Sequence, residues 1–325
     1  MPTEPSIFDA AGALTREYLL DRGYCCENGC RNCPYGFRKP DSPQRPARRA
    51  LRLTNLTRNE PVPRRIVSLC PSNTEILHAL GLMDRVVGVD DWSDWPESVR
   101  DIPRVGPDQQ VSIERVRALK PDLVLASLSV PGMEWNIHRL ETSGLPYDTI
   151  VPHGLDGLWD NIRQVGRITG TAARAEDLVS SLQHRITEVS AAADHAHRPR
   201  VYFEWWPKPL FAPGKRNWLT SITEIAGGIS ITGNVDAESA NPSFEDVIAA
   251  DPVYIFMAWT GVARERVRPH VLTRRPGWER IAAVRAGRVY VVDEGLFCRP
   301  SPRLIDGLEL LASVLKGNPP ASPFR

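Results

Sequence analysis

Four cysteines lie within nine residues near the start of the chain, which has six cysteines in all. They are Cys25, Cys26, Cys30 and Cys33, in the stretch YCCENGCRNCPYGF. The C-x-x-C pair can present two thiolates to one ion, as in zinc and iron–sulfur sites, and one of the two adjacent cysteines can add a third. We therefore predict a zinc or iron–sulfur module here. A redox-active dithiol and a module without a cofactor are the alternatives.

Tryptophans follow strand-like segments in the rest of the chain. Trp92 and Trp95 lie in DDWSDWP, Trp205 and Trp206 in FEWWPKP, and Trp259 follows VYIFMA. Ligands of open α/β sheets bind outside the carboxyl ends of the strands, and tryptophans offer a large flat surface on which conjugated ligands stack. The pattern predicts a ligand site with aromatic walls. For any one of these side chains, packing at the surface of a lobe is the alternative.

The sequence has no catalytic signature outside the cysteine module. It lacks a hydrolase elbow, a phosphate loop and a dinucleotide glycine pattern, and its seven histidines never pair at i, i+4. We expect His78, in the apolar helix TEILHAL, to be a packed core residue. Cys70 and Cys298 are expected beside the ligand site, where a thiolate could bind cobalt or iron, although isolated cysteines are usually small buried hydrophobes. We predict a binding protein. The alternative is a cytoplasmic redox or metal-cofactor-handling enzyme that uses the cysteine cluster.

Charge and hydropathy limit the partners and the location. The net charge is +1, so nothing predicts nucleic acid as a partner. Residues 1–65 hold twelve Arg and Lys against seven Asp and Glu, whereas the remainder holds 28 against 32. The first residues lack the apolar run of a secretory signal, and no segment approaches the roughly 20 apolar residues of a membrane span. We expect a cytoplasmic location, or a periplasmic or cell-surface one if the start site or export route is unusual.

Short apolar strands alternate with helical patterns from Ile66 onward. The segments RIVSL, VVGV, DLVLA, YDTIV, RVYFEW, VYIFMAW and RVYVVDEG read as strands, and Ser72 to Glu75 has the form of a capping box. This alternation predicts an α/β fold with mainly parallel sheets. The predicted parts are a cysteine-rich module at 1–37, a Pro- and Arg-rich linker at 38–65, an α/β lobe at 66–154, a connecting helix at 155–195 and a second α/β lobe at 196–325.

An internal repeat supports two lobes. SIERVRALKPDLVL, from Ser112, aligns without gaps with SFEDVIAADPVYIF, from Ser243. In each copy a Ser can cap a short helix, with Glu114 or Glu245 in its first turn, and a Pro leads into an apolar strand. Two homologous lobes would explain the match. A common helix-then-strand recipe is the alternative.

Ile66 to about Leu315 resembles the substrate-binding proteins of ABC importers for vitamin B12, siderophores and haem. The motifs that carry the resemblance are IVSLCPSNTEILHALGL, VVGVDDWSDWP, SIERVRALKPDLVLA, PSFEDVIAADP and FCRPSPRLIDGLELLA. DWSDWP and CRPSPRLIDGLE look most like the cobalamin-binding branch. The resemblance implies the helical-backbone, class III fold, with cobalamin or a related corrinoid, or another metal chelate, in a cleft between the lobes. The cysteine stretch resembles a short module, CCxNGCRxCPYG, which implies no activity.

The same resemblance implies roles for single residues. Trp92 matches an aromatic residue that contacts the corrin, and Trp95 lies beside it. Arg299 matches a cleft arginine that contacts the ligand. Glu114 and Glu245 match paired carboxylates that dock onto arginines of an ABC permease. Residues around Asn241 have no tryptophan where a B12-binding relative has one in its second lobe, and Trp205 or Trp206 could substitute for it. We expect a monomer.

Overall fold

The computed structural model describes residues 15–16, 51–57, 61–262 and 264–318. Contacts divide the chain into two units, Met1–Arg45 and Pro46–Arg325. Cys25, Cys26, Cys30 and Cys33 lie outside the described residues, so the metal module remains a prediction. Everything that follows concerns the second unit.

The first lobe is built on a four-stranded parallel sheet in the order β2-β1-β3-β4. Ile66 packs into one hydrophobic cluster and its neighbour Val67 into another, so the sheet is buried on both faces, as parallel sheets usually are. The strands are β1 (Ile66–Ser68), β2 (Val86–Val89), β3 (Leu123–Ser127) and β4 (Tyr147–Ile150). The helices are α2 (Pro71–Ala79), α3 (Ile113–Ala118) and α4 (Glu134–Ser143), with short turns η2 (Met83–Arg85) and η3 (Glu97–Asp101).

Residues 51–57 extend this lobe at the edge strand β4. Thr54 forms a bridge to Asp148, and the side chain of Asn55 accepts a bond from the backbone N–H of Tyr147 and donates one to the carbonyl of Leu145. The Tyr147 hydroxyl donates to the carbonyl of Arg52 at 2.6 Å. This part of the predicted linker is therefore held on the lobe by hydrogen bonds that satisfy the exposed edge of the sheet.

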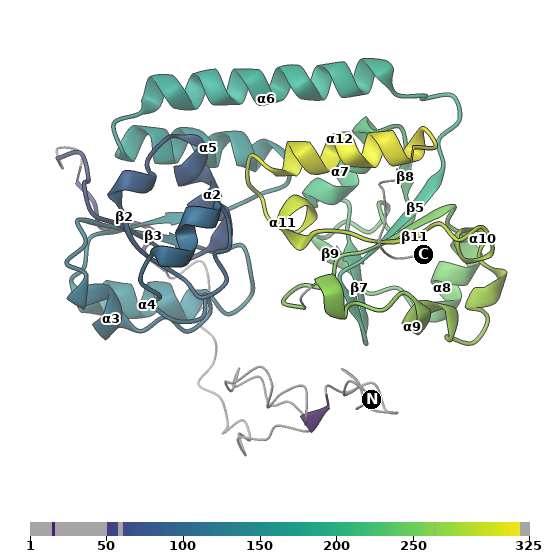
Figure 1. The fold of residues 1–325 in the computed structure, drawn as a ribbon, viewed down its shortest axis with the longest axis horizontal. Helices are drawn as coiled ribbons and strands as arrows, with labels where there is room; N and C mark the ends of the chain where they lie inside the picture. Colours follow the sequence, from purple (N-terminus) through teal and green to yellow (C-terminus); the bar gives the residue numbers. More distant parts are fainter. Residues whose placement is uncertain (1–14, 17–50, 58–60, 263, 319–325) are drawn as a thin grey trace. The chain divides into compact units, whose positions relative to one another are not determined.

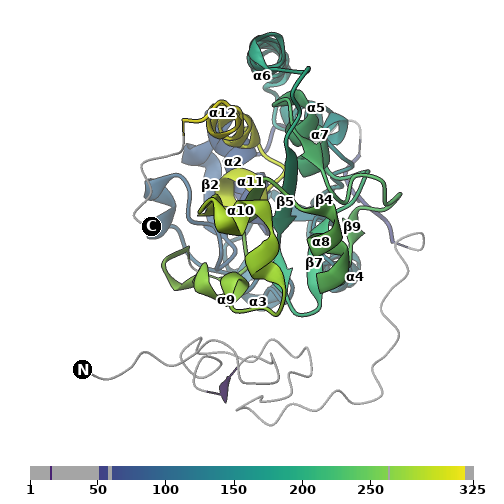
Figure 2. The same cartoon turned by 90° about the vertical axis from the view of Figure 1, so that its right-hand side faces the viewer.

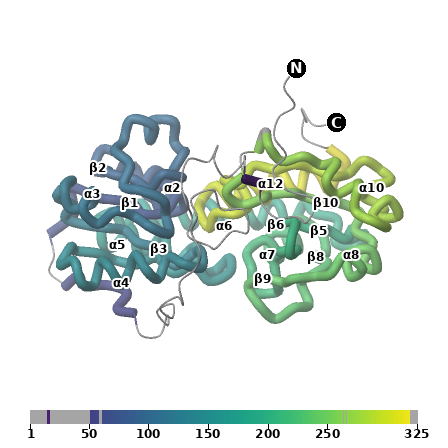
Figure 3. The backbone as a smooth tube through the Cα atoms, turned by 90° about the horizontal axis from the view of Figure 1, so that it is seen from below, coloured from purple at the N-terminus to yellow at the C-terminus, as the bar shows by residue number. Residues whose placement is uncertain are grey.

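The second lobe repeats the parallel arrangement and adds a small antiparallel sheet. Its parallel sheet has the order β11-β10-β5-β8, and the antiparallel one the order β6-β7-β9. The strands are β5 (Arg200–Glu204), β6 (Trp206–Pro207), β7 (Leu210–Pro213), β8 (Ile229–Ser230), β9 (Ser239–Ala240), β10 (Tyr254–Met257) and β11 (Val289–Val291). The helices are α7 (Trp218–Ile225), α8 (Phe244–Ala250), α9 (His270–Thr273), α10 (Ala282–Arg285), α11 (Glu294–Phe297) and α12 (Leu304–Leu315), with turns η4 (Arg264–Arg266) and η5 (Trp278–Arg280). Figure 3 shows β1, β2 and β3 in one lobe and β5, β6, β8, β9 and β10 in the other.

Two helices, not one, occupy the stretch predicted as the connecting helix. These are α5 (Asp156–Ile168) and α6 (Ala172–Ala192), and the chain turns between them at Gly170, whose φ of +71° favours glycine. The helices cross closely, because a Cβ on Gly166 would lie 2.4 Å from Cβ of Ala175. The 21-residue α6 is the long helix that links the lobes (Figure 1).

Helix α6 packs against helices of both lobes. Arg185 on α6 pairs with Asp306 and Glu309 on α12, at 2.6 and 2.7 Å. Figure 2 looks nearly along α6 and α12 and shows α6 outermost. One hydrophobic cluster includes Ile162 of α5, Val179 of α6 and Leu308 of α12. The predicted fold class, two α/β lobes with mainly parallel sheets and a long linking helix, is confirmed.

The predicted capping box at α2 is wrong. The helix begins at Pro71 with Cys70 as its N-cap, and no side chain caps its backbone. Glu75 is instead buried and bonded to the second lobe. His78, predicted to be a core residue, is exposed. None of the helices in the described part of the chain has both the length and the apolar character that a membrane crossing requires.

Candidate ligand-binding site between the two lobes

Arg299 joins the two lobes. It precedes α12 in the second lobe, and its Nη1 donates to Glu75 on α2 at 2.9 Å and to Asp94, in the loop after β2, at 2.5 Å. Its Nη2 donates to the second oxygen of Asp94 at 3.2 Å. Burial alone would lower the pKa of Arg299, but the bond to Asp94 and the charge of Glu75 outweigh burial and raise it. The guanidinium is therefore fully charged.

Glu75 is the centre of this network. Besides Arg299, it accepts bonds from the hydroxyl of Ser301 and from Nη1 of Arg303, the latter at 3.2 Å. Burial raises the pKa of Glu75, while Arg299, Ser301 and Arg303 act in the opposite direction. These donors offset part of the cost of burying the carboxylate, and they tie α2 to the segment just before α12.

Trp95 and Arg303 add an aromatic contact across the same junction. The guanidinium carbon of Arg303 lies 4.6 Å from the ring centre of Trp95, a cation–π distance. His78 meets the same ring edge-on, with 6.3 Å between centroids. The indole of Trp95 is nevertheless 42% exposed, which leaves surface for a ligand.

Three carboxyls near Arg299 have raised pKa values. Burial raises the pKa of Asp90 to about 6, although Ser93 and the backbone N–H of Trp92 bond to it. Burial and the charges of Asp90 and Glu294 raise the pKa of Asp108 to about 7. Burial also raises the pKa of Glu294, against the charge of Arg299. Since Glu294 belongs to the second lobe and acts on Asp108 of the first, acidic groups of both lobes influence one another here.

Trp92 is half-buried in the loop after β2, at the carboxyl end of that strand. The loop is fixed by Asp90, which accepts bonds from the backbone of Trp92 at 2.8 Å and from the hydroxyl of Ser93 at 2.5 Å. Arg104 donates to the carbonyls of Asp90 and Ser93. The aromatic side chain is thus carried on a rigid loop.

The second lobe offers Trp205 and Trp206 at the carboxyl end of β5, both half-buried. Trp259 is different, because it is only 1% exposed and its Nε1 donates to Glu204 at 3.1 Å. Glu204 also holds Arg275 through two bonds of 2.6 and 2.9 Å. Trp259 is therefore a core residue, and the expectation that it lines the ligand surface is wrong.

The cysteines beside the site are held as thiols. Cys70 is 3% exposed, and its Sγ lies 3.2 Å from the hydroxyl of Ser72 and 3.4 Å from that of Ser129. Burial, with the charges of Asp108 and Asp90, raises the pKa of Cys70 to about 11. Burial likewise raises the pKa of Cys298, whose Sγ donates to a backbone carbonyl. Both groups therefore favour the neutral thiol over the thiolate that a metal requires.

Glu114 and Glu245 lie at equivalent places in the two lobes, and both are exposed. Each stands in the first turn of a short helix, α3 or α8, behind a capping serine. The hydroxyl of Ser112 donates to Glu114 at 3.0 Å, and together with a backbone N–H it lowers the pKa of that carboxyl. The repeat seen in the sequence is therefore the same helix-and-strand unit in each lobe.

Sequence reasoning missed four residues that are bonded at the junction, namely Glu75, Asp94, Ser301 and Arg303. It also missed the three acids near Arg299, which are Asp90, Asp108 and Glu294. Glu75 was assigned to a helix cap, and its partner Arg299 is 224 positions away. Asp94 lies between the two tryptophans of DDWSDWP, where an acid beside exposed aromatics was the available signal. Arg303 follows Arg299 by four positions, and this repeated arginine before the last helix could have marked it.

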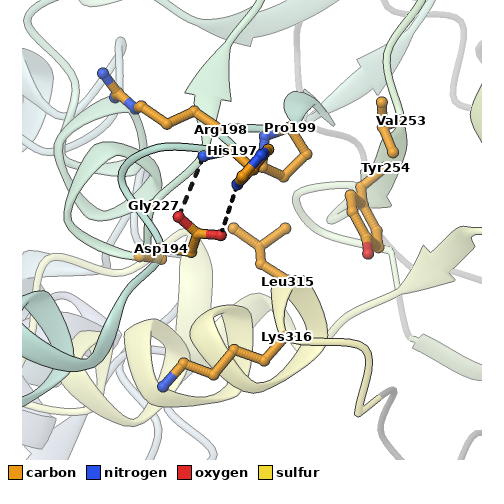
Figure 4. Close-up of a pocket in the computed structure, with 10 residues that line it drawn as sticks. Asp194, His197, Arg198, Pro199, Gly227, Val253, Tyr254, Leu315 and Lys316 are labelled. Atoms are coloured by element: carbon orange, nitrogen blue, oxygen red, sulfur yellow. Dashed lines mark hydrogen bonds and ion pairs between the residues drawn. The ribbon is translucent and has the colours of Figure 1, made fainter.

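A separate cavity of about 670 Å³ lies where β5 and β10 begin, at the end of these strands opposite to the one that carries Trp205. Asp194, His197, Arg198, Tyr254 and Lys316 are among its lining residues (Figure 4). Asp194 accepts from the backbone and ring of His197, and Arg198 donates to the carbonyl of Gly228 at 2.8 Å. Its charged side chains are largely occupied by one another and by the backbone.

Comparison with known proteins assigns the family. Residues 66–296 match the periplasmic binding protein family. The chain belongs to this family. The binding protein is 32% identical, over 78% of its length and 80% of the relative's, to an uncharacterized ABC transporter substrate-binding lipoprotein of Bacillus subtilis. It is 26% identical to a vitamin B12-binding protein of Vibrio parahaemolyticus, over 77% of its own chain and 88% of the other.

A solved structure agrees with these relatives. A periplasmic heme binding protein from Pseudomonas aeruginosa has a TM-score of 0.69 and 26% identity, covering 81% of the binding protein and 96% of that chain. Residues 10–39 match a family of unknown function, which adds no role for the cysteines. The binding protein is thus of the ABC substrate-binding type. Its relatives bind ligands and are not enzymes, as predicted.

The prediction of a cytoplasmic location is wrong. The matched family is that of periplasmic binding proteins, and the Bacillus subtilis relative is a lipoprotein. The prediction depended on the lack of an apolar run at the start of the sequence, which is a weaker guide than the family. Monomeric state remains a prediction.

Proposed function

We propose that the protein binds a corrinoid, or a related metal chelate, between its two lobes and delivers it to an ABC permease. The observation that carries this proposal is the junction at Arg299, where loops at the carboxyl ends of the strands bring aromatic and charged side chains of both lobes together. The relatives are named for vitamin B12 and heme, which are both flat metal chelates.

The aromatic side chains fit a flat ligand. Trp92 and Trp95 belong to one lobe, and Trp205 and Trp206 to the other. Trp95 is 42% exposed and the other three are half-buried, so Trp95 offers the most surface for stacking. A stacked ligand would be held by a face from each lobe, while the charged side chains around Arg299 would contact its edge.

Glu114 and Glu245 are proposed to contact the permease. They are exposed carboxylates on equivalent helices, one in each lobe, and neither belongs to the junction at Arg299. Two such carboxylates at a fixed separation would let arginines on two permease subunits recognise both lobes at once. This docking role is separate from ligand binding and can be tested separately.

The experiment is an absorbance titration of the purified full chain with cobalamin, cobinamide and haem. We expect saturable binding of at least one of them. Trp92→Ala removes one stacking face and is expected to weaken it by about ten- to a hundredfold, since such a contact contributes roughly 1–3 kcal/mol. Glu97→Ala, at an exposed position of the same lobe, is the control and should not change affinity.

Two results would count against the proposal. If none of the three compounds binds, the corrinoid and haem assignment fails. If one binds with the same affinity to the wild type and to Trp92→Ala, the ligand lies elsewhere. Circular dichroism of the variant distinguishes a lost contact from a lost fold.

A further inference from the structure

We propose that Asp94 binds Arg299 at the place where an acidic group of the ligand binds. When the ligand enters, its acidic group replaces Asp94 on Arg299. The inference rests on the proposed function, because it assumes that the ligand binds at the junction of the lobes. It adds a chemical requirement: the preferred ligand carries a carboxylate or a phosphate at its edge. It also assigns to Asp94 the role of an internal competitor.

The geometry of Arg299 separates a fixed partner from an exchangeable one. Glu75 bonds to Nη1 alone, at 2.9 Å, whereas Asp94 takes both Nη1 and Nη2, at 2.5 and 3.2 Å. Asp94 therefore makes the two-oxygen contact that a planar carboxylate or a phosphate makes with a guanidinium. A ligand acid of the same shape can replace it directly.

Burial makes the same distinction. The Glu75 side chain is 1% exposed and also accepts bonds from Ser301 and Arg303, so it cannot leave without uncovering buried donors. The Asp94 side chain is 68% exposed. An exposed carboxylate regains water when it is displaced, so its release costs little. Asp94 is the partner that a ligand can replace.

Arg299 has a donor that neither partner satisfies. Its side chain is 10% exposed, and among the described residues its Nε is buried without a hydrogen-bond acceptor. An unsatisfied buried donor costs about 1–3 kcal/mol in general. A ligand oxygen that reached Nε as well as Nη2 would satisfy it, which Asp94 does not do. The unpaired Nε of Arg299 therefore favours the replacement of Asp94 by a ligand acid that can reach it.

Charges around the guanidinium set the pH dependence of the exchange. Asp90, Asp108 and Glu294 act on Arg299 or on one another and would repel an incoming acid when ionised, whereas Arg303 and Arg104 would attract it. Burial and neighbouring acids raise the pKa of Asp108 to about 7. Below that pH its repulsion is removed. An acidic ligand should therefore bind more tightly at pH 6 than at pH 8.

The test uses two matched ligand pairs and the variant Asp94→Asn. Cobalamin carries a phosphodiester that cobinamide lacks, and haem carries two propionates that its dimethyl ester masks. Asp94→Asn removes the competing charge but keeps the side-chain shape. We expect it to raise affinity for the acidic member of the pair that binds by about tenfold. Affinity for the member that lacks the acidic group should change by less than about twofold.

Asp101→Asn controls for the lost negative charge, because Asp101 is an exposed acid of the same lobe. It should leave both affinities unchanged. Two outcomes overturn the inference while the proposed function stands. In the first, Asp94→Asn raises the affinity for both members of a pair equally. In the second, it lowers the affinity for the acidic member, which would make Asp94 a ligand contact. If the wild type binds neither pair, the proposed function fails and the inference fails with it. A gain in affinity for cobalamin would identify the acidic group as a phosphate, and a gain for haem would identify it as a carboxylate.

Discussion

Removing the carboxylate of Glu75 should loosen the junction between the lobes. In Glu75→Ala, Arg299 and Arg303 lose a buried anion, and the Ser301 hydroxyl loses its acceptor. Breaking one side of a buried ion pair generally costs about 3–5 kcal/mol. Arg299 keeps Asp94 as a partner, and Arg303 lies 4.0 Å from Asp293, so part of that cost is avoided.

We therefore expect a loss of about 2–4 kcal/mol, or roughly 3–7 °C in Tm for a chain of this size. The assay is urea unfolding of the full chain, followed by tryptophan fluorescence and by circular dichroism, so that separate transitions of the lobes would be seen. Glu75→Gln keeps the shape and one acceptor and should cost less than Glu75→Ala.

The control is Glu97→Ala, which breaks an ion pair with Arg100 whose side chains are 83% and 73% exposed. It should change stability by no more than about 0.5 kcal/mol. If Glu75→Ala costs no more than this control, the network does not hold the lobes together.

Arg275→Ala leaves Glu204, which is fully buried, without its two-bond partner and should cost about 3–5 kcal/mol by urea unfolding; a loss below about 1 kcal/mol would contradict this. Asp108 has a pKa of about 7 in the folded protein against an ordinary 3.8, so its ionisation opposes folding. As the pH rises from about 4 to 7, the wild type should therefore lose stability relative to Asp108→Asn, by at most about 1.4 kcal/mol per pH unit. Stability profiles of the two proteins that stay parallel over this range would contradict the prediction. Glu114→Ala combined with Glu245→Ala should leave ligand affinity and Tm unchanged but lower uptake of the ligand by cells that express the protein; unchanged uptake would exclude the docking role.

Local patterns predicted the strands and the paired lobes because they depend on nearby residues. Alternating apolar strands and helices gave the parallel sheets, and the serine-capped repeat placed Glu114 and Glu245 on equivalent helices.

Contacts between distant segments could not be predicted in this way. Glu75 fits a capping motif, yet a buried arginine 224 positions later determines its orientation. Trp259 looked like a loop aromatic, but its indole N–H finds an acceptor in Glu204 and the ring is buried. Residues 51–57 have a linker composition, although they satisfy the edge of β4. In each case a partner far along the chain outweighed the local signal.

The most direct test of ligand binding between the lobes is isothermal titration calorimetry of the full chain with cobalamin. We expect one ligand per chain, and weaker binding in both Trp92→Ala, from the first lobe, and Trp206→Ala, from the second. Binding that is unaffected by one of the two substitutions would place the ligand on a single lobe. It would contradict the proposal that the two lobes share it.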